Sequence, residues 1–223
     1  MSDAAKRAAG AAAAALVEDG MRLGLGSGST MRFALAALGA RIRTHGLRVA
    51  GVPTSAATEA WARAEGIPLV PLDGQPLDLA LDGADEVEAG TLRLLKGAGG
   101  ALWREKIVAG AARALVIVAD ESKLVPLLGT RMPLPVEIDG FGAAATLRRL
   151  ADLGGAPVLR AGPPTDGGHR IADCAGFAPI RDPFTLERSL RAIPGVIGTG
   201  LFLMPVARVL LGRMDGSVHE IRA

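Results

Sequence analysis

The sequence of residues 77–106 is LDLALDGADEVEAGTLRLLKGAGGALWREK. Its leucines at positions 77, 79 and 81 have the period of two that is typical of a buried β-strand. Four acidic residues follow within residues 82–88, more than turn chemistry alone needs. Ligands of open α/β sheets bind outside the carboxyl ends of strands, so we expect Asp82 and Asp85 to lie in such a site.

A lysine and a glycine-rich loop come next, at Lys96 and residues 97–100. Such a loop lets backbone N–H groups approach an oxyanion or phosphate closely. A helix is predicted from Ala101 to Ala112, with Glu105 near its start, where the helix dipole favours an ionised carboxylate. Together these groups suit proton transfer on a polar, anionic small molecule. Each alone is more often a solvated residue or half of a structural ion pair, so the prediction rests on their clustering.

The composition excludes several classes of protein. With 223 residues and 49% apolar content, the chain is long enough for a well-packed core. Its formal net charge is only +2, it has no run of Lys or Arg, and it has no Tyr, so we expect no nucleic-acid partner. The alanine-rich N-terminus predicts a helix rather than a signal peptide, and no stretch is apolar enough to span a bilayer. We therefore expect a cytoplasmic protein with no membrane partner.

Cysteine and histidine content bears on metal sites. Cys174 is the only cysteine, which excludes an intramolecular disulfide and a thiolate cluster. The three histidines, His45, His169 and His219, lack the spacing of a metal site. We expect all three at the surface.

A second glycine-rich loop has the sequence GLGSGST, at residues 24–30. It follows a predicted strand at 21–25 and precedes a predicted helix at 31–45, an order that aims N–H groups and hydroxyls at an anion. It is neither a Walker A loop nor G-x-G-x-x-G, so a single phosphate is a better candidate than a dinucleotide. The alternative is an ordinary turn capped by Ser29 or Thr30.

The order of predicted elements defines the fold class, which is α/β. Strands and helices alternate up to Val125, which predicts a doubly wound, Rossmann-like, mostly parallel sheet. Residues 128–204 follow the order βαββαβ, with a last strand over 196–204, which predicts a small ferredoxin-like α+β domain. We therefore predict a Rossmann-like catalytic domain of residues 1–127 and 205–223, and a small domain of residues 128–204.

These motifs together resemble the type A family of ribose-5-phosphate isomerases. They fall in order over nearly the whole chain: GLGSGST (24–30), LDGADEVE (81–88), KGAGGALWREKIVA (96–109), ADESKLV (119–125), LPVEI (134–138) and IPGVIGTGLF (193–202). The resemblance implies an aldose–ketose isomerase that interconverts ribose 5-phosphate and ribulose 5-phosphate in the pentose phosphate pathway. It also implies that the enzyme uses no metal and no cofactor, and that it forms a homodimer or a dimer of dimers.

The resemblance also assigns roles by position. Glu105 matches the family's proton acceptor, and Lys6 is a further candidate near the phosphate. The substrate-binding positions match Ser27, Gly28, Ser29 and Thr30; Asp82, Gly83, Ala84 and Asp85; Lys96, Gly97, Ala98 and Gly99; and Lys123. Trp103 stands where the family has a smaller residue, so a ring turned toward the site would alter substrate fit.

The expected catalytic residues follow from the chemistry. Asp82 or Asp85 suits the proton exchange of furanose ring opening, and Glu105 suits proton transfer between C2 and C1. The charged amine of Lys96 would stabilise the enediolate oxygens.

Two other functions are alternatives to an isomerase. A related sugar-phosphate enzyme, such as a hexosamine-phosphate deaminase or a sugar-lactone hydrolase, would be expected to use a histidine, and none lies in or beside the three candidate loops. A non-catalytic sugar-phosphate-binding module, like the effector domain of a transcription regulator, would be expected to accompany a DNA-binding helix-turn-helix and to have lost its catalytic carboxylates. This chain has no spare length for a helix-turn-helix, and it keeps Asp82, Asp85 and Glu105.

Overall fold

A computed structural model describes residues 3–222 of the chain. Its contacts divide the chain into two compact units. Unit 1 takes in the described parts of Met1–Ala84, Arg104–Lys123 and Pro205–Ala223, and unit 2 takes in Asp85–Trp103 and Leu124–Met204. Residues 85–103 therefore cluster with the segment predicted as the small domain, whereas the boundaries drawn from the sequence assign them to the large one.

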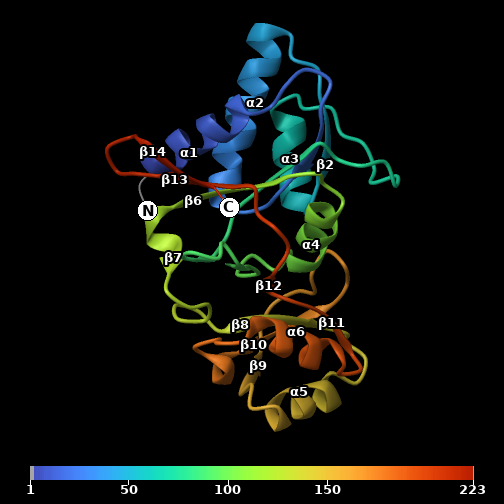
Figure 1. Cartoon of the computed structure of the whole chain (residues 1–223). Coiled ribbons are helices and arrows are strands. Elements are labelled where there is room, and N and C mark those ends of the chain that lie inside the picture. The colour runs from blue at the N-terminus through green and yellow to red at the C-terminus, as the bar shows by residue number, and fades with distance from the viewer. Residues whose placement is uncertain (1–2, 223) are drawn as a thin grey trace. The chain divides into compact units, whose positions relative to one another are not determined.

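Unit 1 is built on a six-stranded sheet (Figure 1) with the order β14-β13-β6-β3-β1-β2. All neighbouring strands are parallel except β14, which pairs antiparallel with β13 at one edge. The bounds are β1 (Arg22–Leu25), β2 (Ala50–Pro53), β3 (Leu79–Asp82), β6 (Leu115–Asp120), β13 (Arg208–Gly212) and β14 (Val218–Arg222). The predicted parallel sheet is confirmed, as is the return of the chain to it after residue 205.

Helices cover both faces of this sheet, as a doubly wound fold requires. Three helices share one apolar cluster with the sheet, whereas the fourth, α4, packs in a separate cluster with β2. The bounds are α1 (Asp3–Ala15), α2 (Ser29–His45), α3 (Ala56–Ala64) and α4 (Leu102–Gly110).

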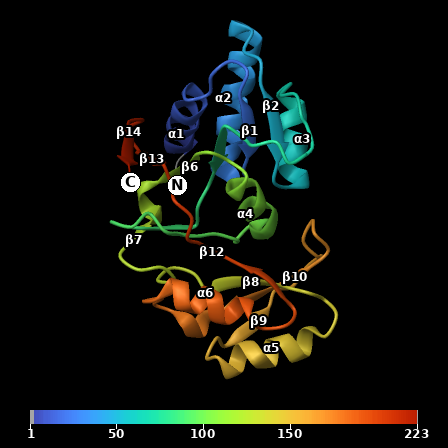
Figure 2. The same ribbon diagram turned by 45° about the vertical axis from the view of Figure 1, so that its right-hand side comes forward.

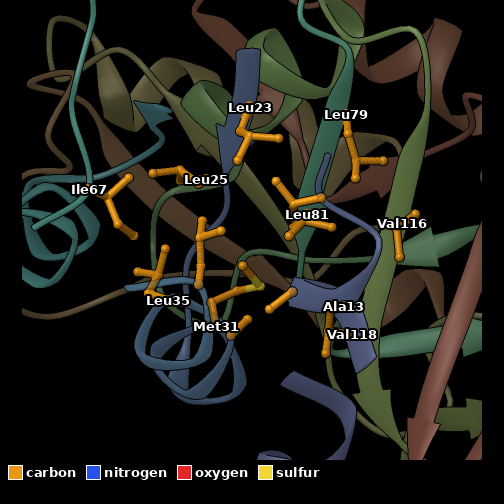
Figure 3. Packing of buried hydrophobic residues seen from close by; sticks show 14 of the residues in the cluster. Ala13, Leu23, Leu25, Met31, Leu35, Ile67, Leu79, Leu81, Val116 and Val118 are labelled. Atoms are coloured by element: carbon orange, nitrogen blue, oxygen red, sulfur yellow. The ribbon is translucent and has the colours of Figure 1, made fainter. Parts of the chain in front are cut away.

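The larger cluster is made of side chains that alternate along the strands. Figure 3 shows Met31 and Leu35 of α2 among them. The strand residues are Leu23 and Leu25 of β1, Leu79 and Leu81 of β3, and Val116 and Val118 of β6. A slip of one residue would turn a whole strand's set to the other face, and each buried Leu contributes about 1.5–3 kcal/mol. This face therefore fixes the register of the sheet.

The other face of β1 carries Gly24, which alternates with the two leucines. A Cβ atom at Gly24 would lie 2.6 Å from Cγ1 of Val108. Glycine here lets α4 pack directly on the strand, and this contact fixes where α4 crosses the sheet.

A surface ion pair in unit 1 gives a test of local electrostatics. Arg48 donates to Asp19 from its backbone N–H (2.8 Å) and from its guanidinium, and these bonds lower the pKa of Asp19 to about 2. Because the folded pKa is depressed, the stabilisation is present above the ordinary pKa of 3.8 and is lost as the pH falls through about 2. We expect Arg48→Ala to raise the pKa of Asp19 part of the way toward 3.8 in an NMR titration of the carboxyl carbon, because the guanidinium is lost while the backbone N–H of residue 48 still donates. An unchanged titration would contradict this account.

Unit 2 contains a four-stranded antiparallel sheet with the order β11-β8-β10-β9. Leu150 of α5 and Leu190 of α6 pack in its apolar cluster, and both helices lie on the same side of the sheet (Figure 2). The bounds are β8 (Leu134–Ile138), α5 (Ala143–Asp152), β9 (Pro157–Leu159), β10 (Arg170–Cys174), α6 (Pro183–Arg191) and β11 (Val196–Thr199). The chain order βαββαβ confirms the ferredoxin-like prediction.

The predicted strand over 196–204 is wrong in its extent, because the chain leaves the sheet at Gly200. The N–H of Gly200 donates to the carbonyl of Pro135 (2.7 Å), and a Cβ atom there would lie 2.3 Å from the carbonyl oxygen of Lys96. The chain then continues as β12 (Leu201–Phe202) in a second sheet with the order β12-β5-β4-β7. The remaining strands are β4 (Glu86–Glu88), β5 (Leu94–Leu95) and β7 (Leu124–Val125).

Cys174 lies at the end of β10 and is fully buried. Burial, together with the negative charge of Asp173, raises the pKa of its thiol to about 12. The thiol is therefore unreactive in the folded protein. Within residues 3–222, no helix has the length and apolar character needed to cross a membrane.

Candidate active site

Unit 1 has a topological switch point between β1 and β3. The chain leaves β1 through α2 to β2 on one side, and returns through α3 to β3 on the other. In a doubly wound sheet the crevice outside the carboxyl ends of these two strands is where ligands bind. The loop after β1 and the end of β3 both carry residues predicted for the site.

The loop after β1 is tied to the carboxylate of Asp82. The N–H groups of Ser27 (3.1 Å) and Gly83 (2.7 Å) both donate to Oδ1 of Asp82, which is 3% exposed. A Cβ atom at Gly26 would lie 2.5 Å from Cα of Asp82, so only glycine allows the two segments to meet. The two segments predicted to bind substrate in unit 1 therefore lie side by side.

Gly26→Ala tests this close approach. The added methyl group would overlap the backbone of Asp82, so we expect kcat/KM to fall about 10- to 100-fold and stability to fall by about 1–3 kcal/mol. Gly110→Ala is the matched control, since a Cβ atom there meets no atom within 4 Å and its φ is not positive. Steady-state kinetics and thermal melts of both variants would decide, and wild-type activity in Gly26→Ala would refute the argument.

A group of hydroxyls not foreseen from the sequence supports Ser27. The Oγ atom of Ser27 lies 2.7 Å from Oγ1 of Thr54 and 3.1 Å from Oγ of Ser55. Thr58 donates from Oγ1 to the carbonyl of Gly26 (3.0 Å). Thr54 and Ser55 come directly after β2, and polar residues at the carboxyl end of a strand were the available signal.

Helix α2 begins at Ser29, and its N-cap is Gly28, with a φ of +99° and no side-chain cap. The predicted helix cap at Ser29 or Thr30 is therefore wrong. Ser29 is exposed, whereas Thr30 is buried. A 17-residue helix whose first N–H groups lack a side-chain cap offers a suitable place for an anion.

Glu105 lies in the first turn of α4 and is 5% exposed. It stands one turn before Val108, the residue that packs on Gly24, so both lie on the side of α4 that faces the sheet. Because α4 leads into the parallel strand β6, its N-terminus lies at the carboxyl edge of the sheet. Glu105 and Asp82 therefore share one edge of unit 1.

The carboxyl end of β6 adds two polar residues at this edge. Lys123 ends a short 3-10 helix, Glu121–Lys123, and is half-buried. Asp120 is 6% exposed and accepts from the N–H of Ser122 at Oδ1 (2.8 Å), while its Oδ2 has no partner among the described residues. Asp120 was not singled out from the sequence.

Asp85 and residues 96–99 belong to unit 2, whereas Ala84 and Lys6, the latter on α1, belong to unit 1. Lys96 is 3% exposed, and its amine lies 5.4 Å from the centre of the Phe202 ring, a cation–π distance. The N–H of Ala98 donates to Oδ2 of Asp85 (2.9 Å), so this carboxylate is joined to the loop of residues 96–99. Gly97, with a φ of +114°, supplies a backbone conformation that other residues rarely adopt.

The family model of ribose 5-phosphate isomerase A (phosphoriboisomerase A) matches residues 50–216. The chain belongs to this family. The ribose-5-phosphate isomerase A of Synechococcus sp. (strain JA-3-3Ab) is 49% identical over 221 residues, which cover 96% of each chain.

Solved structures agree with this family. The ribose 5-phosphate isomerase A of Methanocaldococcus jannaschii has a TM-score of 0.93 and 42% identity, with 98% of each chain covered. A D-ribose-5-phosphate isomerase in complex with phospho-erythronic acid has a TM-score of 0.92 and 35% identity, again over 98% of each chain. These comparisons give no support to the alternative of a non-catalytic binding module.

The acidic residues of segment 82–88 in this isomerase-family chain have different roles, and two of them are structural. Glu86 is fully buried and accepts from the N–H groups of Gly129 (2.6 Å), Arg131 (2.6 Å) and Met132 (3.1 Å). Glu88 accepts from the hydroxyl of Thr91 (2.5 Å). These two glutamates therefore anchor unit 2.

Trp103, the residue that departs from the family pattern, packs within unit 2. A Cβ atom at Gly198 would lie 2.7 Å from its ring, and the guanidinium of Arg191 lies 5.7 Å from the ring centre. The indole thus lies against β11.

The histidines differ in their surroundings. His45 and His219 are exposed, as predicted, whereas His169 is half-buried and donates from Nδ1 to the buried Glu137 (3.0 Å). Among residues 3–222 no three His, Cys, Asp or Glu side chains gather as a metal-binding group.

Proposed function

We propose that this chain interconverts ribose 5-phosphate and ribulose 5-phosphate, the reaction of its family in the pentose phosphate pathway, with Glu105 as the base. The observation that carries the assignment of the base is the placement of Glu105. It is a buried carboxylate in the first turn of α4, at the same edge of the sheet as Asp82. Binding of ribose 5-phosphate, ring opening and isomerisation would involve separate groups.

The phosphate group fits the N-terminus of α2. The first N–H groups of this helix, the hydroxyls of Ser29 and Thr30, and the amine of Lys123 are suited to a dianion. Binding there would direct the sugar toward Asp82, because Ser27 joins the same loop to that carboxylate.

Ring opening requires a proton to leave the anomeric hydroxyl and another to reach the ring oxygen as the C1–O4 bond breaks. Asp82 and Asp85 are the carboxylates assigned to this exchange. Both accept backbone N–H bonds, which orient them.

Isomerisation then begins from the open-chain aldehyde. Glu105 removes the proton from C2, the electron pair forms the C1–C2 double bond, and O1 becomes anionic. A proton passes from O2 to O1, and Glu105 returns its proton to C1, which leaves the ketone at C2. The amine of Lys96 and the N–H groups of residues 97–99 stabilise the negative charge on O1 and O2.

The proposal includes three further statements. Catalysis is independent of a metal, because the Lys96 amine supplies the positive charge. The chain acts as a homodimer or a dimer of dimers, and it works in the cytoplasm. The family resemblance supports these statements, and light scattering on the purified protein would test the assembly.

The first experiment measures ribulose 5-phosphate formation from ribose 5-phosphate by the purified protein, with and without EDTA. We expect equal rates. A rate abolished by EDTA and restored by a divalent metal would keep the reaction but overturn the roles of Lys96 and Glu105. A folded protein with no activity, whose melting temperature still rises with phospho-erythronic acid, would be a binding module instead.

A further inference from the structure

Arg160 makes four hydrogen bonds within unit 2 that connect the ferredoxin-like sheet to the loop of residues 96–99. Its Nη1 donates to the carbonyl oxygens of Gly97 (2.9 Å) and Ala98 (3.1 Å). Its Nε and Nη2 donate to the two carboxylate oxygens of Asp173 (2.9 and 2.5 Å). The guanidinium is therefore held by an acid on β10 while it binds the backbone of the loop.

We propose that Arg160 is a positioning residue for the isomerisation, which acts by orienting the peptide groups of residues 97–99. The inference rests on the proposed function, because it takes this loop to be part of the active site. It assigns a role to a residue far from the loop in sequence.

The geometry of the peptide bond explains the effect. In a trans peptide, the carbonyl of one residue and the N–H of the next point in opposite directions. By holding the carbonyls of Gly97 and Ala98 on one side, Arg160 turns the N–H groups of Ala98 and Gly99 to the other side. The N–H of Ala98 does donate to Asp85 there (2.9 Å). Arg160 thus sets the side on which an oxyanion meets N–H donors.

The loop depends on such support because its own sequence gives it little rigidity. Glycine loses the most conformational freedom on folding, and three of residues 97–100 are glycine. One turn bond, from the N–H of Gly100 to the carbonyl of Gly97 (3.1 Å), closes the loop. Arg160 shares that same carbonyl. The planar guanidinium can hold both carbonyls and the Asp173 carboxylate together, which an ammonium group does less well.

The test compares Arg160→Ala, Arg160→Lys and a matched control, Arg48→Ala. Arg48 also donates hydrogen bonds from Nε and Nη2 to an aspartate, Asp19, but on the surface of unit 1. We expect Arg160→Ala to lower kcat about 10- to 100-fold per folded molecule, with KM within about threefold of wild type, because the loss acts on the transition state. The kcat of Arg160→Lys should lie between those of wild type and Arg160→Ala. Millimolar guanidinium should restore part of the kcat of Arg160→Ala. The kcat of Arg48→Ala should equal that of wild type.

Two outcomes would overturn the inference. One is a wild-type kcat in Arg160→Ala. If that variant does not fold, a wild-type kcat in Arg160→Lys has the same meaning. Lys96→Met, measured in parallel, shows whether the inference about Arg160 or the proposed active site itself has failed. An active Lys96→Met would remove the loop from the active site, whereas an inactive one beside an unaffected Arg160→Ala would reject only the role of Arg160.

Discussion

Glu105→Gln is expected to lower kcat about 10²- to 10⁴-fold, the contribution of a positioned general base. The amide has the size of the carboxyl group and keeps hydrogen-bonding capacity, but it cannot accept the proton from C2. Substrate binding should therefore change little, and KM should stay close to that of wild type. The measurement is the steady-state rate, together with deuterium incorporation at C1 in heavy water, followed by NMR.

Glu59→Gln is the matched control for this variant, because Glu59 is a glutamate of α3 that pairs with Arg63 at the surface (2.8 Å). It should keep wild-type kinetics. A kcat in Glu105→Gln comparable to that of wild type would rule out Glu105 as the base and return the question to the other carboxylates of the same edge, Asp82 and Asp120.

Lys96→Met should have the second largest effect, a loss of about 10²- to 10³-fold in kcat, the usual result of removing one donor to a developing oxyanion. Methionine is chosen because Lys96 is buried and its amine lies over the ring of Phe202, and a thioether also packs well against an aromatic ring. The variant should therefore fold, and circular dichroism should match that of wild type.

The diagnostic measurement for Lys96→Met compares its kcat with its binding of phospho-erythronic acid. If Lys96 acts on the enediolate, kcat should fall while phospho-erythronic acid, whose phosphate is held elsewhere, still raises the melting temperature. A kcat within about threefold of wild type would contradict the role of Lys96 and would take the loop of residues 96–99 out of the proposed active site.

Much of the fold could be predicted because its signals are local. The alternating leucines of β1 and β3 place one face of each strand in the core, and the change from βαβ order to βαββαβ order marks the ferredoxin-like segment. The sheet β12-β5-β4-β7 could not be predicted in this way. Its strands have two or three residues, too few to show a period, and they pair across the chain.

The same distinction applies to the candidate site. Asp82, Asp85, Lys96 and Glu105 are visible because they cluster in a single stretch of sequence. The hydroxyls that support Ser27 lie 27 to 31 residues away, and Arg160 lies 62 residues from Ala98. Such partners are brought together only by tertiary structure, so a pattern search along the chain does not find them.

The buried thiol has a practical use in biophysics. With Cys174 fully buried and its thiol pKa raised to about 12, a maleimide at neutral pH has no accessible thiolate to attack in the folded protein. A cysteine introduced at Met214 in unit 1 or at Phe141 in unit 2, which are 75% and 93% exposed, would be the sole labelling site. With both substitutions in one chain, a donor and an acceptor dye could be attached, and energy transfer between them could be followed as sugar phosphate is added.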